Sequence, residues 1–222
     1  MSKTRTIDIP EYIKHGLASI KAQFEKPGDS DLVSVLARLV AKGKPVSTEE
    51  LAEATGWNLE QTRDVLSRYP IDRDESGLIL GFVLTLKPTP HKFTFDDISI
   101  FGWCAADVLF APVVLGKPGV AESKCPVTKH AIRVEVSPQG VLSVDPPDAV
   151  VSAFRPTEKV QNIRTDLCDL GHFYSSREAA AEWLKVNPEG QLNSVPDDFE
   201  IQRRISEEIG WTAKEQKSQA GA

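Results

Sequence analysis

The sequence has no apolar segment close to the roughly 20 consecutive residues that a membrane-spanning helix needs. Its first residues, Met1 to Asp8, also lack the apolar stretch of a secretory signal peptide. The composition is that of an ordinary globular protein, with 41% hydrophobic and 26% charged residues. We therefore expect a cytoplasmic protein, in which thiols normally stay reduced.

The chain also lacks a surplus of positive charge. Its 32 acidic residues outnumber its 26 lysines and arginines, which gives a net charge of −6 at pH 7. Nucleic-acid binding requires a basic surface that faces the phosphates. Neither a nucleic acid nor a membrane is therefore expected as a partner.

Cysteines are few, and their pattern excludes two common structural roles. The three thiols are Cys104, Cys125 and Cys168, an odd number that cannot form a complete disulfide framework. No CxxC pair or Cys/His cluster has the spacing of a zinc site. Any role for the thiols therefore depends on their local surroundings.

The first part of the chain has the pattern of a small helical domain. Apolar spacing predicts helices over residues 9–24, 32–42, 48–55 and 59–67. Ser47 and Glu50 have the spacing of a capping box, and Asn58 can cap the following helix. A turn at residues 74–77 precedes an apolar stretch, 78–86. Three helices followed by a hairpin are typical of a winged helix-turn-helix.

The charge of this region does not favour DNA binding. In the candidate recognition helix, Arg63 and Arg68 are balanced by Glu60 and Asp64. Residues 1–90 contain 12 basic and 13 acidic residues. A domain that reads a DNA groove should present a basic face, so a structural or lid role is favoured.

Beyond a linker at residues 88–90, the pattern changes to short strands. Strands are expected over residues 91–95, 119–124, 130–136, 141–144, 150–154 and 171–175. Asp96 is expected to cap a helix over residues 97–109. Further helices are expected after Ser176 and over residues 197–209.

These patterns together predict an α+β protein. We expect a winged-helix-like domain at residues 1–87, then a mixed, mostly antiparallel sheet with packed helices at residues 88–211. The polar segment 212–222 is expected to be a disordered tail.

Cys104 is followed three residues later by Asp107, which places the two side chains on one face of the predicted helix. A nearby carboxylate does not lower the pKa of a thiol, because like charges repel. The pair is therefore better suited to moving a proton than to activating a nucleophile. Asp107 can accept the thiol proton when sulfur binds a soft electrophile, such as a heavy metal, and then deliver it to a leaving group.

The other candidate residues differ in their surroundings. Asp166 and Asp169 flank Cys168, which makes it less like a core position, whereas the apolar neighbours of Cys104 also suit a buried structural residue. Cys125 lies at the end of a strand and has no acid–base partner nearby, so a structural role is expected. His172 is expected to be packed rather than catalytic.

The segments that carry these thiols resemble one enzyme family. The run from Phe101 to Pro112, which contains Trp103-Cys104-Ala105-Ala106-Asp107, is similar to a signature of the bacterial organomercurial (alkylmercury) lyases. The segment from Arg164 through Cys168 to Ser176 is similar to a second signature. The resemblance covers roughly residues 30–185, and it assigns catalysis to the domain at residues 88–211.

The resemblance implies a mercury-detoxifying lyase that protonates a carbon–mercury bond to give a hydrocarbon and Hg(II). Cys104 and Cys168 would bind mercury, Asp107 would carry the proton and complete the coordination of Hg(II), and Cys125 would be structural. No organic cofactor or stored metal is implied, but small thiols would be needed to remove Hg(II), with a mercuric reductase as a candidate acceptor. Asp169 stands where some relatives carry another cysteine. We also expect Trp103 and Phe101 to shape an apolar pocket, and Arg164 to steady the loop of Cys168.

Two other functions fit the same residues. A thiol-based transcriptional sensor would bind DNA through the winged helix and respond to metal or oxidant. A member of the family that has lost turnover would only sequester mercury. DNA binding and hydrocarbon release, respectively, distinguish these alternatives from a lyase.

Overall fold

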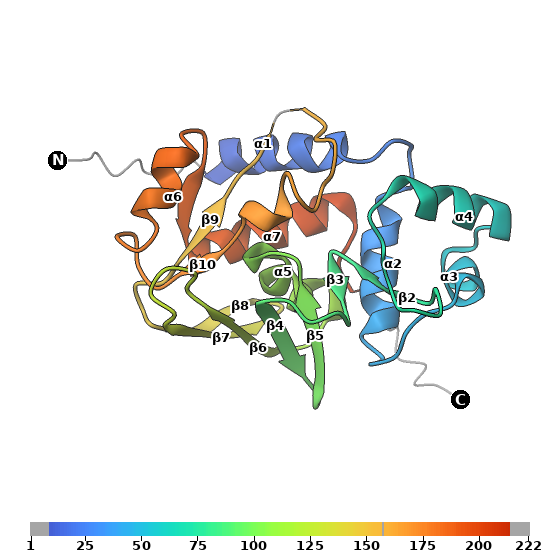
Figure 1. The fold of residues 1–222 in the computed structure, drawn as a ribbon, viewed down its shortest axis with the longest axis horizontal. Coiled ribbons are helices and arrows are strands. Elements are labelled where there is room, and N and C mark those ends of the chain that lie inside the picture. Colours follow the sequence, from blue (N-terminus) through green and yellow to red (C-terminus); the bar gives the residue numbers. More distant parts are fainter. Residues whose placement is uncertain (1–8, 157, 214–222) are drawn as a thin grey trace, which may run out of the picture.

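The computed structural model describes residues 9–156 and 158–213, which form an α+β protein (Figure 1). Its first part is helical, as the sequence predicts. The helices are α1 (Ile9–Ala22), α2 (Asp31–Val40), α3 (Thr48–Thr55) and α4 (Leu59–Arg68). Ser47 and Glu50 form the predicted capping box at the start of α3, and the Asn58 side chain accepts the Gln61 backbone N–H at the start of α4.

A single antiparallel sheet runs through both parts of the chain. Its strands are β1 (Asp72–Arg73), β2 (Ile79–Phe82), β3 (Leu84–Thr85), β4 (His91–Phe95), β5 (Ile98–Gly102), β6 (Gly119–Lys124), β7 (Ala131–Ser137) and β8 (Gly140–Asp145). Their order is β1-β2-β3-β5-β4-β6-β7-β8, and every neighbouring pair is antiparallel. The hairpin of the winged helix thus continues directly into the larger sheet.

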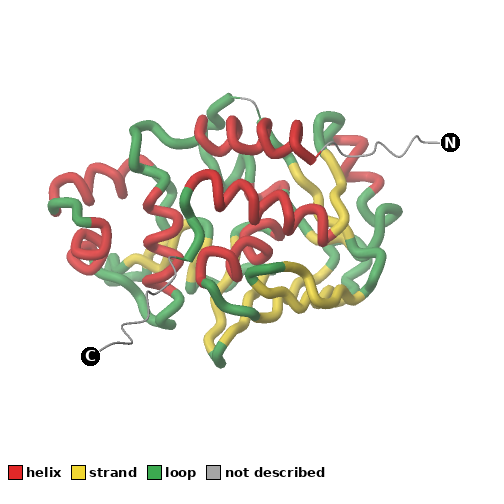
Figure 2. The backbone as a smooth tube through the Cα atoms, turned by 180° about the vertical axis from the view of Figure 1, so that it is seen from behind, coloured by secondary structure: helices red, strands yellow, loops and turns green. Residues whose placement is uncertain are grey.

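Helices cover one side of this sheet in successive layers. Helix α5 (Ala105–Leu115) contacts strands β3 to β7, α7 (Val195–Ile209) packs on α5, and α1 packs on α7 (Figure 2). A second sheet, in the order β10-β9-β11, is formed by β9 (Val150–Ala153), β10 (Phe173–Tyr174) and β11 (Gln191–Ser194). The short 3₁₀ helix η1 (Cys168–Leu170) and α6 (Ala181–Val186) complete the described elements.

The helix expected over residues 97–109 is wrong. The structure has a β-hairpin, β4–β5, followed by α5, which begins only at Ala105. Asp96 and Asp97 form the turn of the hairpin, with φ angles of 43° and 63°. Aspartate is favoured at helix N-caps and also tolerates the left-handed conformation, so the same residues suit either structure.

Two other boundaries differ from the expected ones. Ser176 does not begin a helix directly, because α6 starts at Ala181 after a turn in which the Ser176 hydroxyl accepts the Ala179 N–H. Thr212, the first residue of the expected disordered tail, is held by Arg38, whose Nη2 lies 2.8 Å from its carbonyl oxygen. Residues 214–222 of that tail lie outside the described residues.

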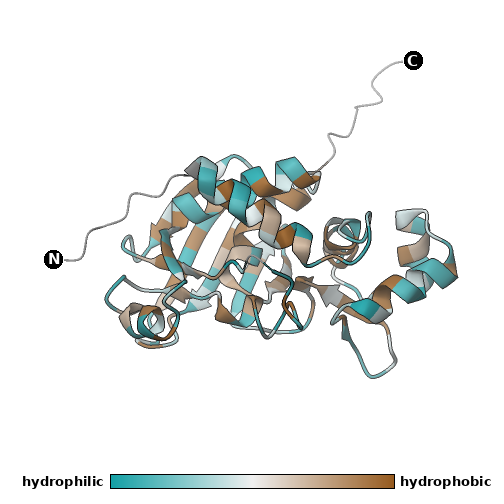
Figure 3. Cartoon of the chain, turned by 90° about the horizontal axis from the view of Figure 1, so that it is seen from above, coloured by the Kyte–Doolittle hydropathy of each residue, from teal (hydrophilic) through white to brown (hydrophobic). Residues whose placement is uncertain are grey.

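One large hydrophobic cluster joins the two parts. It extends from Leu32 and Leu36 in α2 through Leu109 in α5 to Phe199 in α7. Figure 3 shows surface helices that carry both hydrophilic and hydrophobic residues, as expected of helices packed on a core. Among the described residues, no helix has the length and apolar character needed to cross a bilayer.

Candidate active site

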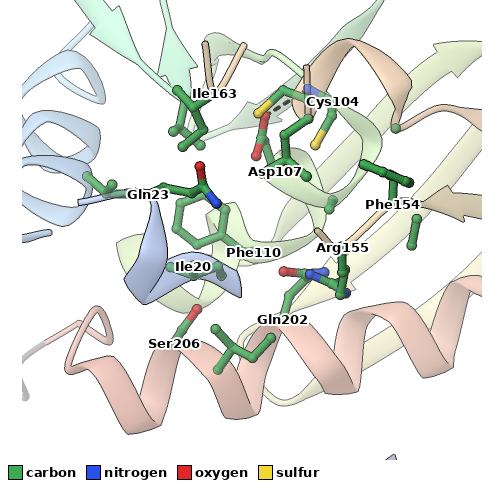
Figure 4. Close-up of a pocket in the computed structure, with 18 of the residues that line it drawn as sticks. Ile20, Gln23, Cys104, Asp107, Phe110, Phe154, Arg155, Ile163, Gln202 and Ser206 are labelled. Carbon is green, nitrogen blue, oxygen red and sulfur yellow. Dashed lines mark hydrogen bonds between the residues drawn. The ribbon is translucent and has the colours of Figure 1, made fainter. Parts of the chain in front are cut away.

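Cys104, Asp107 and Cys168 meet at the N-terminal end of α5. Figure 4 shows the Cys104 and Asp107 side chains next to each other at this point. The two sulfur atoms and a carboxylate oxygen of Asp107 lie within 4.8 Å of one another. All three residues are buried, with exposed fractions of 6–7%. The structure therefore brings together, in one enclosed cluster, the three residues that the sequence predicts as the site.

Cys104 and Asp107 are held by the start of α5 rather than by a continuous helix. Cys104 is the N-cap residue, and the Asp107 carboxylate accepts its backbone N–H with an N–O distance of 2.8 Å. The predicted adjacency is therefore present, but it arises from the carboxylate half of a capping box. Gly102 makes this possible, because a Cβ there would lie 2.7 Å from the Cβ of Asp107.

Cys168 is carried by a loop that is tied together by its own hydrogen bonds. The N–H of Cys168 donates to the Ile163 carbonyl, and the N–H of Asp169 donates to the Arg164 carbonyl at 2.8 Å. The expectation that flanking acids make Cys168 less buried is wrong. Its side chain turns inward, whereas Asp169 is exposed and the Asp166 carboxylate bonds the loop at the Asn162 N–H.

A direct backbone link connects the two thiol segments. The N–H of Ala105, the residue after Cys104, donates to the carbonyl oxygen of Gly171 at 3.0 Å. Gly171 in turn donates its N–H to the Cys168 carbonyl at 2.9 Å. The backbones of the two thiol segments are therefore joined by main-chain hydrogen bonds.

Burial brings the pKa of Asp107 into a range that suits proton transfer. Desolvation raises the pKa of its carboxyl group to about 7, against the lowering effect of the hydrogen bond from the Cys104 N–H. A group with this pKa exchanges protons readily near neutral pH. The charge of buried Asp198 adds to the upward shift.

Both thiols are held in the protonated form. Hydrogen bonding to Cys168, burial and the charge of Asp107 raise the pKa of Cys104 well above its usual range. Hydrogen bonding from Cys104 lowers the pKa of Cys168, but burial and Asp107 outweigh it, so the pKa of Cys168 is also raised. A soft metal that binds these sulfurs must therefore displace protons, and Asp107 is placed to receive one.

The cluster opens into a mostly apolar cavity of about 100 Å³. Its apolar walls come from α1 and the segment after it, from α5, from the loop before Cys168, and from α7 and the segment after it. They include Ile20, Phe24, Phe110, Ile163, Ile205 and Trp211. Arg155 and Gln202 supply polar groups on the side away from the thiols (Figure 4). Such a cavity suits a small apolar group attached to a metal.

The aromatic residues expected to shape this cavity do not line it. Trp103 is turned to the other side and donates its indole N–H to Asp72 at 2.7 Å, and Phe101 lies on β5. Phe110 lines the cavity instead. It lies one helical turn beyond Asp107, so helical spacing could have identified it once α5 had been placed correctly. Trp211, from the far end of the chain, gave no such signal.

Cys125 and His172 lie outside the cluster. Cys125 is fully buried at the end of β6, and hydrogen bonds from Thr128 and Ser175 bring its pKa down to about 6 in spite of its burial. The His172 ring stacks on His91, with 5.9 Å between the ring centroids, as expected for a packed residue. The role of Cys125 stays a prediction.

The structure thus combines a helical N-terminal segment with an α+β fold that holds a buried Cys–Asp–Cys cluster, a set of side chains that could hold a metal ion. Family comparison gives the particular class. The alkylmercury lyase family model matches residues 84–207, and the model for the helix-turn-helix domain of alkylmercury lyase matches residues 13–83. The chain belongs to the alkylmercury lyase family, which confirms the resemblance seen in the sequence and the prediction that it is an enzyme.

Curated relatives and a solved structure agree with this assignment. The chain is 39% identical to an alkylmercury lyase of Staphylococcus epidermidis, over 77% of this chain and 79% of that protein. It is 41% identical to one of Bacillus cereus, over 76% and 77%. The fold resembles the crystal structure of the mercury-bound form of MerB2, with a TM-score of 0.73 and 19% identity over 88% of this chain and 98% of that chain.

Proposed function

We propose that the protein cleaves carbon–mercury bonds by protonolysis and that Cys104, Cys168 and Asp107 carry out the reaction. The convergence of two sulfurs and a carboxylate within 4.8 Å supports this proposal more than any other observation. Family membership and the apolar cavity that receives the organic group support it further.

The reaction begins when one thiol replaces the outgoing ligand of an organomercurial and its proton leaves with that ligand. A single thiolate on mercury gives a linear species that resists protonation in water. The second thiol then binds, and its proton passes to ionised Asp107. The positive end of the α5 dipole favours the negative charge that collects at this point.

Two thiolates push electron density onto mercury and make its carbon more basic. Asp107 then gives its proton to this carbon, the carbon–mercury bond breaks, and a hydrocarbon leaves. Hg(II) stays on the two sulfurs, with a carboxylate oxygen of Asp107 beside it. Of the two thiol protons, one has left with the first ligand and the other is now on carbon. Small thiols in solution take Hg(II) from the site and restore the enzyme.

The direct test is the release of benzene from phenylmercury in the presence of excess cysteine. Cys104→Ser, Cys168→Ser and Asp107→Asn should each lose about 10²-fold or more in rate, the lower range for removing a positioned proton carrier. Cys125→Ser is the matched control and should keep most of the activity. Full activity in Cys168→Ser would rule out the two-thiolate mechanism, and mercury binding without benzene release would indicate sequestration.

A further inference from the structure

Asp72, in the wing of the helix-turn-helix part, contacts both segments that carry the catalytic thiols. Its Oδ2 accepts the indole N–H of Trp103 at 2.7 Å, and its Oδ1 accepts a hydrogen bond from Nη1 of Arg164, also at 2.7 Å. Trp103 immediately precedes Cys104, and Arg164 lies four residues before Cys168. One carboxylate from β1, which does not itself line the cavity, therefore contacts both segments.

The two partners of Asp72 are also in contact with each other. The guanidinium carbon of Arg164 lies over the ring of Trp103, 4.8 Å from its centroid. The backbone of Arg164 belongs to the same support, because its carbonyl oxygen accepts the N–H of Asp169, next to Cys168. The side chain of Arg164 therefore contacts Asp72 and Trp103, and its backbone carbonyl is hydrogen-bonded to the loop of Cys168.

The Asp72 contacts are rigid because they are buried. The side chain of Asp72 is 5% exposed, and that of Arg164 is 27% exposed. A buried carboxylate requires partners for both oxygens, and a charge-assisted pair holds its geometry closely. Lys87 also approaches Asp72 at 3.9 Å, but its side chain is 56% exposed, so this ion pair contributes less than the buried contacts.

We propose that Asp72 is a positioning residue that sets the separation of the Cys104 and Cys168 sulfurs, so that the wing of the helix-turn-helix part serves mercury chelation. The inference rests on the proposed function, because it concerns the same two thiols. Capture of an organomercurial by the first thiol needs only one sulfur. Asp72 acts on the next step, in which the second sulfur must reach the same mercury atom.

The test compares Asp72→Asn with Asp74→Asn in the full-length protein. Asp74 lies two residues further along the same hairpin, is partly exposed, and bonds only within its own turn, to Ser76 and Leu78. Each protein is loaded with one equivalent of Hg(II), and its ultraviolet thiolate-to-mercury absorption is recorded before any thiol is added. Glutathione is then added at increasing concentration, and the mercury that stays with the protein after gel filtration is measured. Asp72→Asn should release half of its Hg(II) at a glutathione concentration at least about tenfold lower than wild type, as expected for loosened chelate geometry. Asp74→Asn should match wild type.

Steady-state kinetics with phenylmercury supply a second readout. Asp72→Asn should lower kcat while KM changes little, because one-sulfur capture is preserved. A purely structural role would lower the melting temperature and the folded fraction but would leave the mercury affinity and kcat of each folded molecule unchanged.

Each outcome supports or overturns one of the two proposals. Equal glutathione sensitivity and kcat in Asp72→Asn and Asp74→Asn overturn the positioning role and leave the lyase proposal intact. Wild-type protein that shows no two-thiolate absorption overturns the proposed function itself. If Asp72→Asn does not fold, Trp103→Phe removes one donor to Asp72 and keeps the ring. It should show the same direction of change, and wild-type behaviour in that variant would overturn the inference.

Discussion

Gly171 lies so close to Cys104 that a Cβ at position 171 would come within 3.0 Å of the Cys104 Cβ and 3.4 Å of its sulfur. The backbone of Gly171 does not adopt a left-handed conformation, so the requirement for glycine here is one of space. The absent side chain leaves the room in which the two thiol segments approach each other.

Gly171→Ala should therefore displace the Cys104 side chain by a few tenths of an ångström and change the separation of the two sulfurs. We expect kcat for phenylmercury to fall about tenfold, since small misplacements of reacting groups cost large factors in rate. Gly140→Ala is the matched control, because a Cβ there meets nothing within 4 Å. Unchanged kcat in Gly171→Ala would show that the sulfurs adjust freely.

The pH dependence of activity should reflect Asp107. Ionised Asp107 is the form that accepts the second thiol proton, and its pKa is about 7 in the free enzyme. The value of kcat/KM should therefore rise as the pH increases through about 7 and fall again at alkaline pH, when the thiols lose the proton needed by carbon. A profile measured with phenylmercury at constant thiolate concentration checks this. An ascending limb that persists in the residual activity of Asp107→Asn would assign it to another group.

The same carboxyl group should make the enzyme less stable as the pH rises. Its pKa is about 7 in the folded protein and near 3.8 when unfolded, so between these values the folded state holds one more proton. Stability falls with pH wherever the folded state binds more protons, and the full cost, on the order of 4 kcal/mol, is reached above pH 7. Asp107→Asn keeps an acceptor for the Cys104 N–H and loses the charge.

Denaturant unfolding of the metal-free protein at pH 5 and pH 8 measures this effect. The difference in stability between Asp107→Asn and wild type should grow in favour of the variant as the pH rises. Equal pH dependence in wild type and Asp107→Asn would mean that ionisation of Asp107 does not destabilise the folded protein.

We expect no DNA binding, because Arg68, one of the two arginines of the candidate recognition helix, is buried and paired with acidic residues. The Arg68 side chain is only 9% exposed, and its Nη2 lies 2.9 Å from Oδ1 of Asp29. Arg68 also pairs with Asp64. Fluorescence anisotropy with labelled duplex DNA at low salt should show no sequence-specific binding. Specific binding that mercury abolishes would instead support a transcriptional sensor.

The Arg68–Asp29 pair should matter for stability. The Asp29 side chain is 4% exposed, and its Oδ2 also accepts the Tyr69 hydroxyl at 2.6 Å. Asp29→Asn removes the negative charge that neutralises the buried Arg68 guanidinium. We therefore expect a loss of about 3–5 kcal/mol in the free energy of unfolding. Asp64→Asn removes the exposed partner of the same arginine and should change stability little. Equal effects of the two substitutions would contradict this distinction.

A local sequence pattern predicts the secondary structure correctly where only one kind of element is compatible with it. Ser47 and Glu50 can cap each other only at the start of a helix, and the structure has that helix. Asp96 was ambiguous, because an aspartate before an apolar run suits both an N-cap and a hairpin turn. The pairing of β4 with β5 and β6 decides between them, and such long-range pairing is not visible in a local pattern.

The sequence predicts those site residues that lie close together in the chain. Cys104 and Asp107 are three residues apart, and the family resemblance added Cys168. Asp72 could not be found in this way, because nothing in the sequence around it distinguishes it from other acids of the hairpin. Its importance comes from contacts with Trp103 and Arg164, 31 and 92 residues away.

The continuous sheet has a consequence for how this enzyme can be divided or recombined. The two family segments meet between residues 83 and 84, which is the junction of β2 and β3. A protein cut there would leave β3 with a free edge, which favours self-association. Grafting the helix-turn-helix segment of a distant relative would demand matched strand register across the graft. The two segments are therefore expected to fold together and not as separable domains.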